Sequence, residues 1–184
     1  MAVLTAVASH AASLRHGLIF DDFAILRDSA ALRTLSGLVQ MMSSPRARPE
    51  SDPSASPVFR PLSALLDWLS WQIFRSETFA QHALSVALHA LVSFLLVRLL
   101  VSMGFRHTAL GLGVLFAAHP ATVVAVAPLA GRDVLLGAAL LLVAVLMVRT
   151  KEPRPAGLLA FLGATASPLC HEVFWWAPLG LASM

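Results

Sequence analysis

The stretch Ala-Leu-Ser-Val-Ala-Leu-His-Ala-Leu-Val-Ser-Phe-Leu-Leu-Val-Arg-Leu-Leu-Val, residues 83–101, decides the fold of this chain. A helix needs about 20 predominantly apolar residues to cross the hydrocarbon core of a bilayer. His89 is the one ionisable residue of this stretch before Arg98. We therefore predict a membrane-spanning helix from Ala83 to Val101, and the segments on both sides are interpreted around it.

The composition extends this prediction to the whole chain. Of the 184 residues, 58% are hydrophobic and 12% are charged, whereas about 25% of the residues in a soluble domain are charged. We predict an all-α, polytopic membrane protein. The net charge of +3 does not indicate nucleic-acid binding, because the arginines are spread out and the aromatic residues lie in apolar stretches. The single cysteine, Cys170, excludes a disulfide within this sequence and gives no metal-ligand pattern.

About five spans are predicted in a single membrane domain, residues 1–184. The first helix, residues 1–19, is marginal because it contains His10, Arg15 and His16. It lacks the basic start of a signal peptide, so we expect it to be retained. A long loop, residues 20–80, separates it from the remaining spans in residues 81–184. After the span at 83–101 these are 108–118, interrupted by His119-Pro120, then 134–148 and the short 156–169.

The long first loop contains two stretches with helical periodicity. The apolar residues of the first are Leu32, Leu35, Val39 and Met42, and those of the second are Leu62, Leu65, Leu66, Leu69 and Ile73. Pro61 suits a first helical turn, and Trp68 and Trp71 suit a bilayer–water interface. We expect two amphipathic interfacial helices. The alternative is a pair of soluble-type helices packed on each other.

Basic residues in the short connections predict the orientation. Those at one end of the predicted spans are Arg98, Arg106, Arg149, Lys151 and Arg154, against Arg132 alone at the other. The positive-inside rule makes the first group cytoplasmic. The long loop and a second set of polar residues then share the non-cytoplasmic face. That set is Asp21, Asp22, His119, Arg132, Asp133, His171 and Glu172.

Asp21 and Asp22 are the strongest candidates for a functional site. They follow Gly17-Leu18-Ile19-Phe20, and a carboxylate close to hydrocarbon is costly enough to suggest a function. The pair could equally mark the end of the first helix and an N-cap for the loop. No span carries the buried acid or the half-helix repeat of a transporter.

The other polar residues also have structural interpretations. His119-Pro120 could be a helix stop, because proline disfavours helical geometry in the residue before it. Arg132 and Asp133 could form a local ion pair or an N-cap, and we prefer this interpretation. A histidine such as His89 on an apolar helix is more often buried and hydrogen-bonded than a ligand.

Six short motifs, in order, carry a family resemblance. They are Phe20-Asp21-Asp22, Phe59-Arg60-Pro61-Leu62-Ser63, His82-Ala83-Leu84 with Leu88-His89-Ala90-Leu91, Leu115-Phe116-Ala117-Ala118-His119-Pro120, Gly131-Arg132-Asp133-Val134-Leu135 and His171-Glu172. The chain resembles the N-terminal membrane half of GT-C glycosyltransferases, in particular the tetratricopeptide-bearing O-mannosyltransferase-like branch and its bacterial relatives.

The resemblance implies transfer of a sugar from a polyprenyl-phosphate donor to an acceptor outside the cytoplasm. Asp21 or Asp22 would be the general base on the acceptor hydroxyl. Cationic groups (Arg60, Arg132 or His171) or a divalent metal would offset charge on the departing phosphate. His119, Asp133 and Glu172 complete the set of residues expected to bind donor phosphate or acceptor.

The chain also departs from the pattern of this family. Val124 occupies the position of a second acid, and His171 stands where many relatives carry lysine. Family members continue beyond the length of this sequence, so we expect a truncated, partly degenerate form. We therefore predict a non-catalytic subunit that packs with membrane lipids and other integral membrane proteins in a larger complex. The alternative is an active or split transferase. The expected location is the bacterial inner membrane, with the first loop periplasmic.

Overall fold

The computed structural model describes residues 1–19, 21–23, 29–44, 59–149 and 153–178. Phe20 of the first motif and the middle of the long loop, residues 45–58, lie outside these ranges. The α-helices are α1 (Ala2–Ser9), α2 (Leu35–Ser43), α3 (Pro61–Phe74), α4 (Thr78–Ser102), α5 (Ala109–Ala118), α6 (Val123–Val126), α7 (Arg132–Val148) and α8 (Pro153–Ala166). Short 3-10 turns are η1 (Ala11–Arg15), η3 (Ala30–Arg33), η4 (Pro120–Thr122), η5 (Leu129–Gly131), η6 (Ser167–Leu169) and η7 (Glu172–Phe174). The described residues are thus all-helical.

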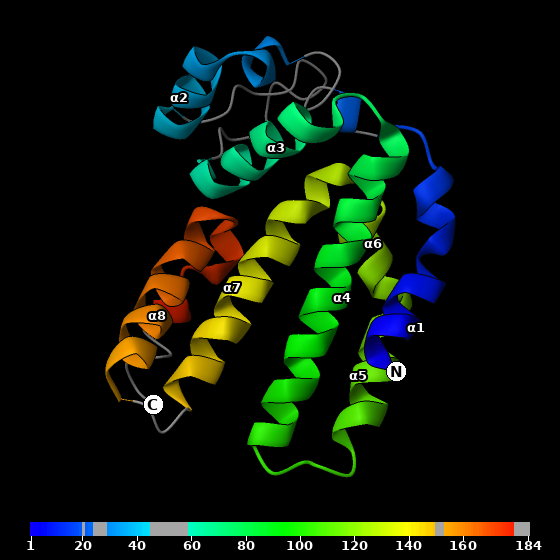
Figure 1. Cartoon of the computed structure of the whole chain (residues 1–184), viewed down its shortest axis with the longest axis vertical. Coiled ribbons are helices and arrows are strands. Elements are labelled where there is room, and N and C mark those ends of the chain that lie inside the picture. The colour runs from blue at the N-terminus through cyan, green and yellow to red at the C-terminus, as the bar shows by residue number, and fades with distance from the viewer. Residues whose placement is uncertain (20, 24–28, 45–58, 150–152, 179–184) are drawn as a thin grey trace.

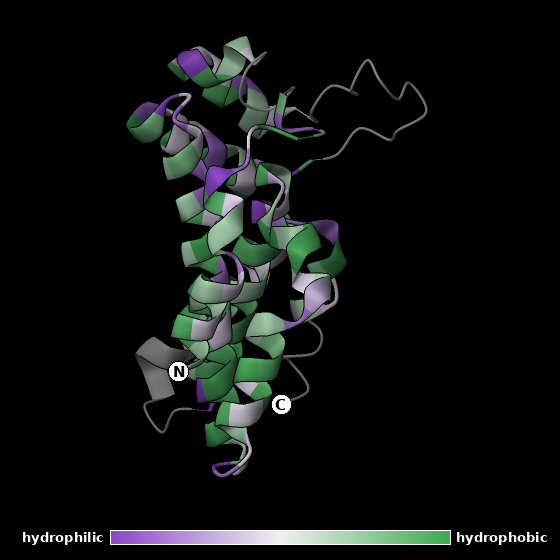
Figure 2. Ribbon diagram, turned by 90° about the vertical axis from the view of Figure 1, so that its right-hand side faces the viewer, coloured by the Kyte–Doolittle hydropathy of each residue, from purple (hydrophilic) through white to green (hydrophobic). Residues whose placement is uncertain are grey.

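Two helices are long and apolar enough to cross a membrane, α4 and the segment Leu129–Val148 that contains α7. The bent pair formed by α5 and Pro120–Val126 would make a third span. Figure 1 shows α4, α5, α7 and α8 side by side along the long axis, with α2 and α3 across one end. Apolar residues cover the length of this bundle, and polar residues gather towards its two ends (Figure 2). The structure supports two to three of the predicted spans, and the count of about five stays a prediction.

The predicted first helix is broken. α1 ends at Ser9, and the chain continues as the η1 turn after His10. Ala6 of α1 is fully buried against Ala90 of α4 and Ala117 of α5. Such small side chains allow close approach between helix backbones, so this short helix lies against two longer ones.

The long helix α4 buries a row of polar residues and exposes several large apolar ones. His82, Ser85, His89 and Ser93 recur every three or four residues and are fully buried, so they share one face. Leu91 and Phe94 are exposed. Apolar outside and polar inside suits a helix surrounded by lipid, because polar groups in a membrane face the bundle interior.

Helix α8 packs tightly against α7. A side chain at Gly163 would place its Cβ 2.9 Å from the backbone oxygen of Leu140 and 3.0 Å from Ala144. A Cβ at Gly137 would lie 2.4 Å from the ring of Phe174. Glycine at these two positions lets α8 and the η7 turn lie directly on α7.

The helices of the long loop pack on each other and on the end of the bundle. Leu32, Trp71 and Leu129 form a buried cluster, with Met41 and Trp68 packed against it. The Trp68 indole also donates a hydrogen bond to the Thr34 carbonyl at 3.1 Å. Trp71, expected at a membrane interface, is buried instead. Leu32, expected to share one helical face with Leu35, lies in the η3 turn before α2.

On its outer side, α2 keeps an apolar stripe. Leu35, Val39 and Met42 are all exposed. This stripe is the amphipathic face that the periodicity predicts, although the other side of α2 packs on protein as in a soluble helix. That α2 lies on a membrane surface stays a prediction.

Candidate functional site

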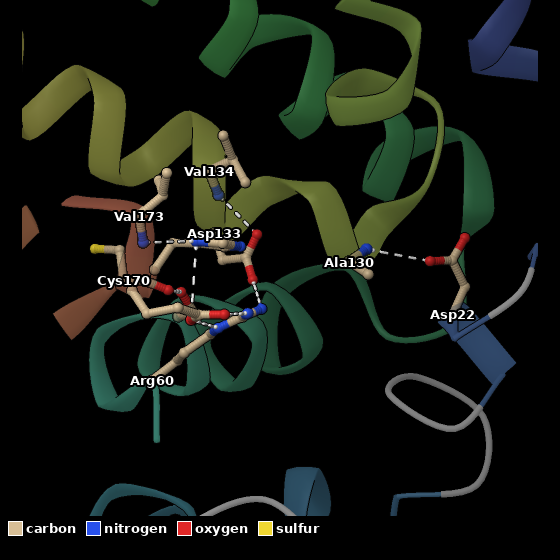
Figure 3. A network of polar contacts seen from close by, with 10 residues as sticks. Asp22, Arg60, Ala130, Asp133, Val134, Cys170 and Val173 are labelled. Carbon is tan, nitrogen blue, oxygen red and sulfur yellow. Dashed lines mark hydrogen bonds and ion pairs between the residues drawn. The ribbon is translucent and has the colours of Figure 1, made fainter. Parts of the chain in front are cut away.

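Three segments that are distant in sequence meet at the end of the bundle that carries α3. Arg60 precedes α3, Asp133 lies in the first turn of α7, and Glu172 begins η7. The guanidinium donates from Nε to Glu172 Oε2 at 2.8 Å and from Nη2 to Oε1 at 2.5 Å, and from Nη1 to Asp133 Oδ2. We call these three residues the Arg60 cluster (Figure 3).

The local sequence holds the Arg60 cluster in place. Pro61 opens α3 directly after Arg60, and the Ser63 hydroxyl donates to the Cys170 carbonyl at 2.8 Å. His171 Nδ1 accepts from the Val173 amide at 3.2 Å. His171 is therefore an N-cap for the η7 turn, and its Nδ1 lies 3.8 Å from Glu172 Oε2.

Charge pairing sets the protonation state of Glu172. The hydrogen bond from Arg60 is the main cause that lowers the pKa of the Glu172 carboxyl to about 2, and burial, the next largest influence, acts in the opposite direction. Glu172 is 53% exposed, whereas the Asp133 side chain is 9% exposed. Two carboxyl groups therefore share one guanidinium. Burial raises the pKa of the neighbouring Cys170 thiol to about 12, which disfavours the reactive thiolate.

Asp22 is held apart from solvent. Its side chain is fully buried, and its carboxylate accepts from the Ile19 amide at 3.1 Å and from the Ala130 amide at 3.2 Å. Burial raises its pKa, while these backbone amides and the nearby His82 act in the opposite direction. Asp22 thus ties the end of the first segment to the η5 turn before α7. Asp21 is exposed.

Arg132 points into the protein. Its guanidinium donates to the Ser85 hydroxyl at 3.0 Å, to the Ser70 hydroxyl at 3.3 Å and to the Gln81 carbonyl. The carboxylates of Asp67 and Asp22 interact with it electrostatically. The preferred interpretation, a local ion pair between Arg132 and Asp133 or an N-cap, is wrong. Each side chain has partners on other elements, and the N-cap residue of α7 is Gly131, with no side-chain cap hydrogen bond. Asp133 does accept a hydrogen bond from the Val134 amide at the start of α7.

His119 lies in the break between α5 and α6. Its Nδ1 accepts from the Ala121 amide at 3.2 Å, and its backbone is extended where α5 ends. This placement is the helix stop offered above as the structural interpretation. His119 is one of the lining residues of a separate pocket, described below.

The structure therefore brings only some of the predicted site residues together. Arg60, Asp133, His171 and Glu172 come together, Asp22 lies beside the same end of the bundle (Figure 3), Arg132 points inward, and Asp21 is exposed. Among the described residues, no group of three or more His, Cys, Asp or Glu side chains could hold a metal ion. Within the described part of the chain, the side-chain donors therefore do not fit a divalent metal.

Sequence reasoning missed the residues that surround Arg132. Ser70, Gln81 and Ser85 supply its hydrogen-bond acceptors. The recurrence of polar residues every three or four positions along an otherwise apolar stretch, at 82, 85, 89 and 93, marks Ser85 as a residue of a buried face, but Ser70 and Gln81 do not belong to this pattern, and the pattern does not identify Arg132 as the partner.

Comparisons with known proteins place these features in context. The chain is 29% identical over 168 residues to the human protein O-mannosyl-transferase TMTC3 and 28% identical to its mouse counterpart. Each match covers 87% of this chain but 18% of the relative's length. No protein-family model matches the chain, and no solved structure matches it significantly. The matches support a distant relationship to GT-C membrane glycosyltransferases.

Proposed function

We propose that this protein is a GT-C-derived integral membrane subunit that does not catalyse sugar transfer and that packs in a larger membrane complex. The observation that carries the proposal is that Arg60 directs its hydrogen bonds at two carboxylates of the same protein. Three of the five guanidinium N–H groups of Arg60, one on each nitrogen, donate to Glu172 or Asp133, and the two carboxylates offset the positive charge that would attract a phosphate. A cation that binds a departing lipid phosphate needs free donors aimed at that phosphate.

The environment of Asp22 supports the same proposal. A general base must come within hydrogen-bond reach of the proton that it removes. The Asp22 carboxylate is fully buried and accepts two backbone amides instead. Its contacts are those of a residue that joins two segments.

The position at which related glycosyltransferases carry a second acid also supports the proposal. Family members that the chain resembles carry a glutamate at the position of Val124, and residues 121–130 contain no carboxylate. Val124 is 77% exposed on α6. An exposed valine here suits contact with lipid or with another membrane helix.

One observation favours an active or split transferase as the second candidate. Asp21 is exposed beside the buried Asp22, so its carboxylate is accessible to an acceptor hydroxyl. The curated relatives are named O-mannosyl-transferases. In this candidate, Asp21 is the base and other chain segments complete the donor site.

The proposal includes a membrane arrangement. The protein has about five spans, α2 and α3 lie at the interface, and the Arg60 cluster is on the non-cytoplasmic side. Arg149 supports this orientation, because it donates to the Ser102 carbonyl at 2.9 Å at the opposite end of the bundle, where the positive-inside rule expects basic residues. The bacterial inner membrane stays a prediction, since the matched relatives are human and mouse.

A transfer assay in the native membranes tests the proposal. Membranes with the wild-type chain, with Asp21→Asn, with Asp22→Asn or without the chain are given a labelled mannosyl polyprenyl phosphate and a Ser/Thr peptide. We expect equal transfer in all four. General acid–base catalysis contributes about 10²- to 10⁴-fold, so a comparable loss on Asp21→Asn alone would establish the second candidate.

A further inference from the structure

A pocket of about 510 Å³ lies between α4, α5, α6 and the first turns of α7, away from the Arg60 cluster. α5 and α7 flank α4 (Figure 1), and both pack on it. The pocket is lined from these three helices by residues that include Val92, Leu115, Phe116 and Ala138. Sites for small molecules are typically about 300–1,000 Å³, so the pocket is large enough for a ligand.

The break in the chain at Pro120 closes one end of this pocket. α5 ends at Ala118, and the segment Pro120–Val126 continues at an angle of 54° to it. Ala121, Thr122 and Ala125 of this segment line the pocket. Because the chain turns here, these residues lie beyond the end of α5 and close the pocket on that side.

The closed end of the pocket lies near the middle of α4. His89 Nε2 is 3.1 Å from the carbonyl oxygen of Ala117, the next-to-last residue of α5. His89 is eleven residues after the start of α4 at Thr78 and thirteen before its end at Ser102. The ten residues of α5 rise about 15 Å, which is half of the hydrocarbon thickness of about 30 Å. The pocket beside α5 therefore has the depth of one leaflet of a bilayer.

The surface of the pocket is almost entirely apolar. No lysine, arginine or carboxylate is among its lining residues. Its three polar lining residues form hydrogen bonds with the backbone. These bonds join His89 to the Ala117 carbonyl, His119 to the Ala121 amide and Thr122 to the His119 carbonyl. Water needs two to four polar partners, whereas a hydrocarbon chain gains the dispersion contacts that an unfilled space would forfeit.

The pocket opens towards the surroundings of the bundle. Leu112 and Leu115 line it and are 45% and 62% exposed. The end of the bundle at which α5 begins carries exposed arginines, at positions 98, 106 and 149. Arginines near a membrane surface attract anionic lipid headgroups. A phospholipid with its phosphate at this level would have its acyl chain beside α5.

We propose that this pocket holds one acyl chain of a phospholipid from the leaflet at the basic end of the bundle, with the end of the chain against α6. A spanning helix of a partner fits less well, because such a helix is about 10–12 Å wide and the pocket ends halfway along α4. The proposal uses the membrane arrangement given above and is independent of whether the protein transfers sugar.

Photo-crosslinking tests the proposal on the assembly that contains this chain, transferred into nanodiscs of phosphatidylethanolamine and phosphatidylglycerol. Two phosphatidylglycerol probes differ only in the position of a diazirine, which lies at the end of one acyl chain or next to its ester group. Mass spectrometry identifies the labelled residues. We expect the chain-end probe to label Ala125 and the ester-side probe to label Leu112. Phe94 of α4, which is exposed and lies outside the pocket, reports contact with ordinary bilayer lipid in the same sample.

Protein variants localise the acyl chain. Ala138→Phe fills the pocket and should abolish the label at Ala125, while the label at Phe94 persists. Leu115→Trp should have the same effect from the exposed side of the pocket, where a larger side chain is tolerated, and it decides the test if Ala138→Phe does not fold. Ala87→Phe, at an exposed α4 position outside the pocket, should leave all labels unchanged.

Three results would overturn the proposal. A label at Ala125 that survives both pocket variants would come from ordinary bilayer lipid. Chain-end label at Leu112 together with ester-side label at Ala125 would mean that the lipid belongs to the opposite leaflet. Labelling of Phe94 without Ala125 or Leu112 would show that a segment of a partner protein fills the pocket.

Discussion

Arg60 pairs with Asp133, 73 residues later in the chain, and so joins the long first loop to the start of α7, a helix long and apolar enough to cross a membrane. Glu172, 112 residues from Arg60, binds the same guanidinium. One side chain therefore connects α3, α7 and the segment after α8.

Replacing Arg60 should destabilise the fold. Arg60→Ala leaves the largely buried Asp133 carboxylate without its cation, and breaking a buried ion pair costs about 3–5 kcal/mol. We expect the loss of unfolding free energy to lie at or below the lower end of this range, because Arg60 and Glu172 are partly exposed. Thermal unfolding in detergent measures it, with the exposed Arg106→Ala as control. Equal midpoints for the two variants would contradict the role of Arg60.

Acid should weaken the contact between Arg60 and Glu172. The folded pKa of Glu172 is about 2, below its ordinary 4.5. A lowered acid pKa stabilises the fold fully above about pH 4.5 and progressively less as the pH falls towards 2. We expect the melting temperature of Glu172→Gln to depend less on pH in this window than that of the wild type. Salt should reduce the difference, since Glu172 is half exposed. If the melting temperatures of the wild type and of Glu172→Gln changed with pH in parallel, the lowered pKa of Glu172 would not contribute to stability.

The two adjacent aspartates should differ in their effect on stability. Asp22→Ala leaves the amides of Ile19 and Ala130 unpaired, at about 1–3 kcal/mol for a buried group. Asp21→Ala changes an exposed side chain and should stay within about 0.5 kcal/mol. Hydrogen exchange resolved at Ala130 should accelerate in Asp22→Ala alone. Faster exchange in both variants would assign Asp21 a structural role as well.

The contact between α7 and α8 should depend on Gly163. Gly163→Leu would force a side chain against the Leu140 backbone and Ala144, and overpacking typically costs about 1–3 kcal/mol. Gly157→Leu, on the same helix with no atom within 4 Å of its added Cβ, is the matched control. A thermal melt that finds the two variants equally stable would show that α8 does not pack on α7 this way.

Hydropathy alone predicted the long helices well. The stretch 83–101 became α4, Thr78–Ser102, and the stretch 134–148 became α7, Arg132–Val148. α4 begins five residues earlier than expected because polar Gln81 and His82 are buried against protein. Hydropathy treats such residues as exposed, so it places the boundary too late.

The candidate site was predictable only in part. Motifs and topology brought Arg60, Asp133 and Glu172 to one face of the membrane, but pairing depends on side-chain directions across three elements. Arg132 and Asp133 are adjacent in sequence yet face different neighbours, because successive helical residues point about 100° apart. Periodicity could not reveal that Arg132 is turned towards Ser85 and Ser70.

The measurement that tests the central claim most directly is the composition of the assembly purified from native membranes in mild detergent. Quantitative mass spectrometry would determine both its proteins and its lipids. A non-catalytic subunit predicts integral membrane partners in fixed ratio, with no polyprenyl phosphate above background. Polyprenyl phosphate that copurifies with the wild-type chain and is lost from the double variant Asp21→Asn, Asp22→Asn would contradict it.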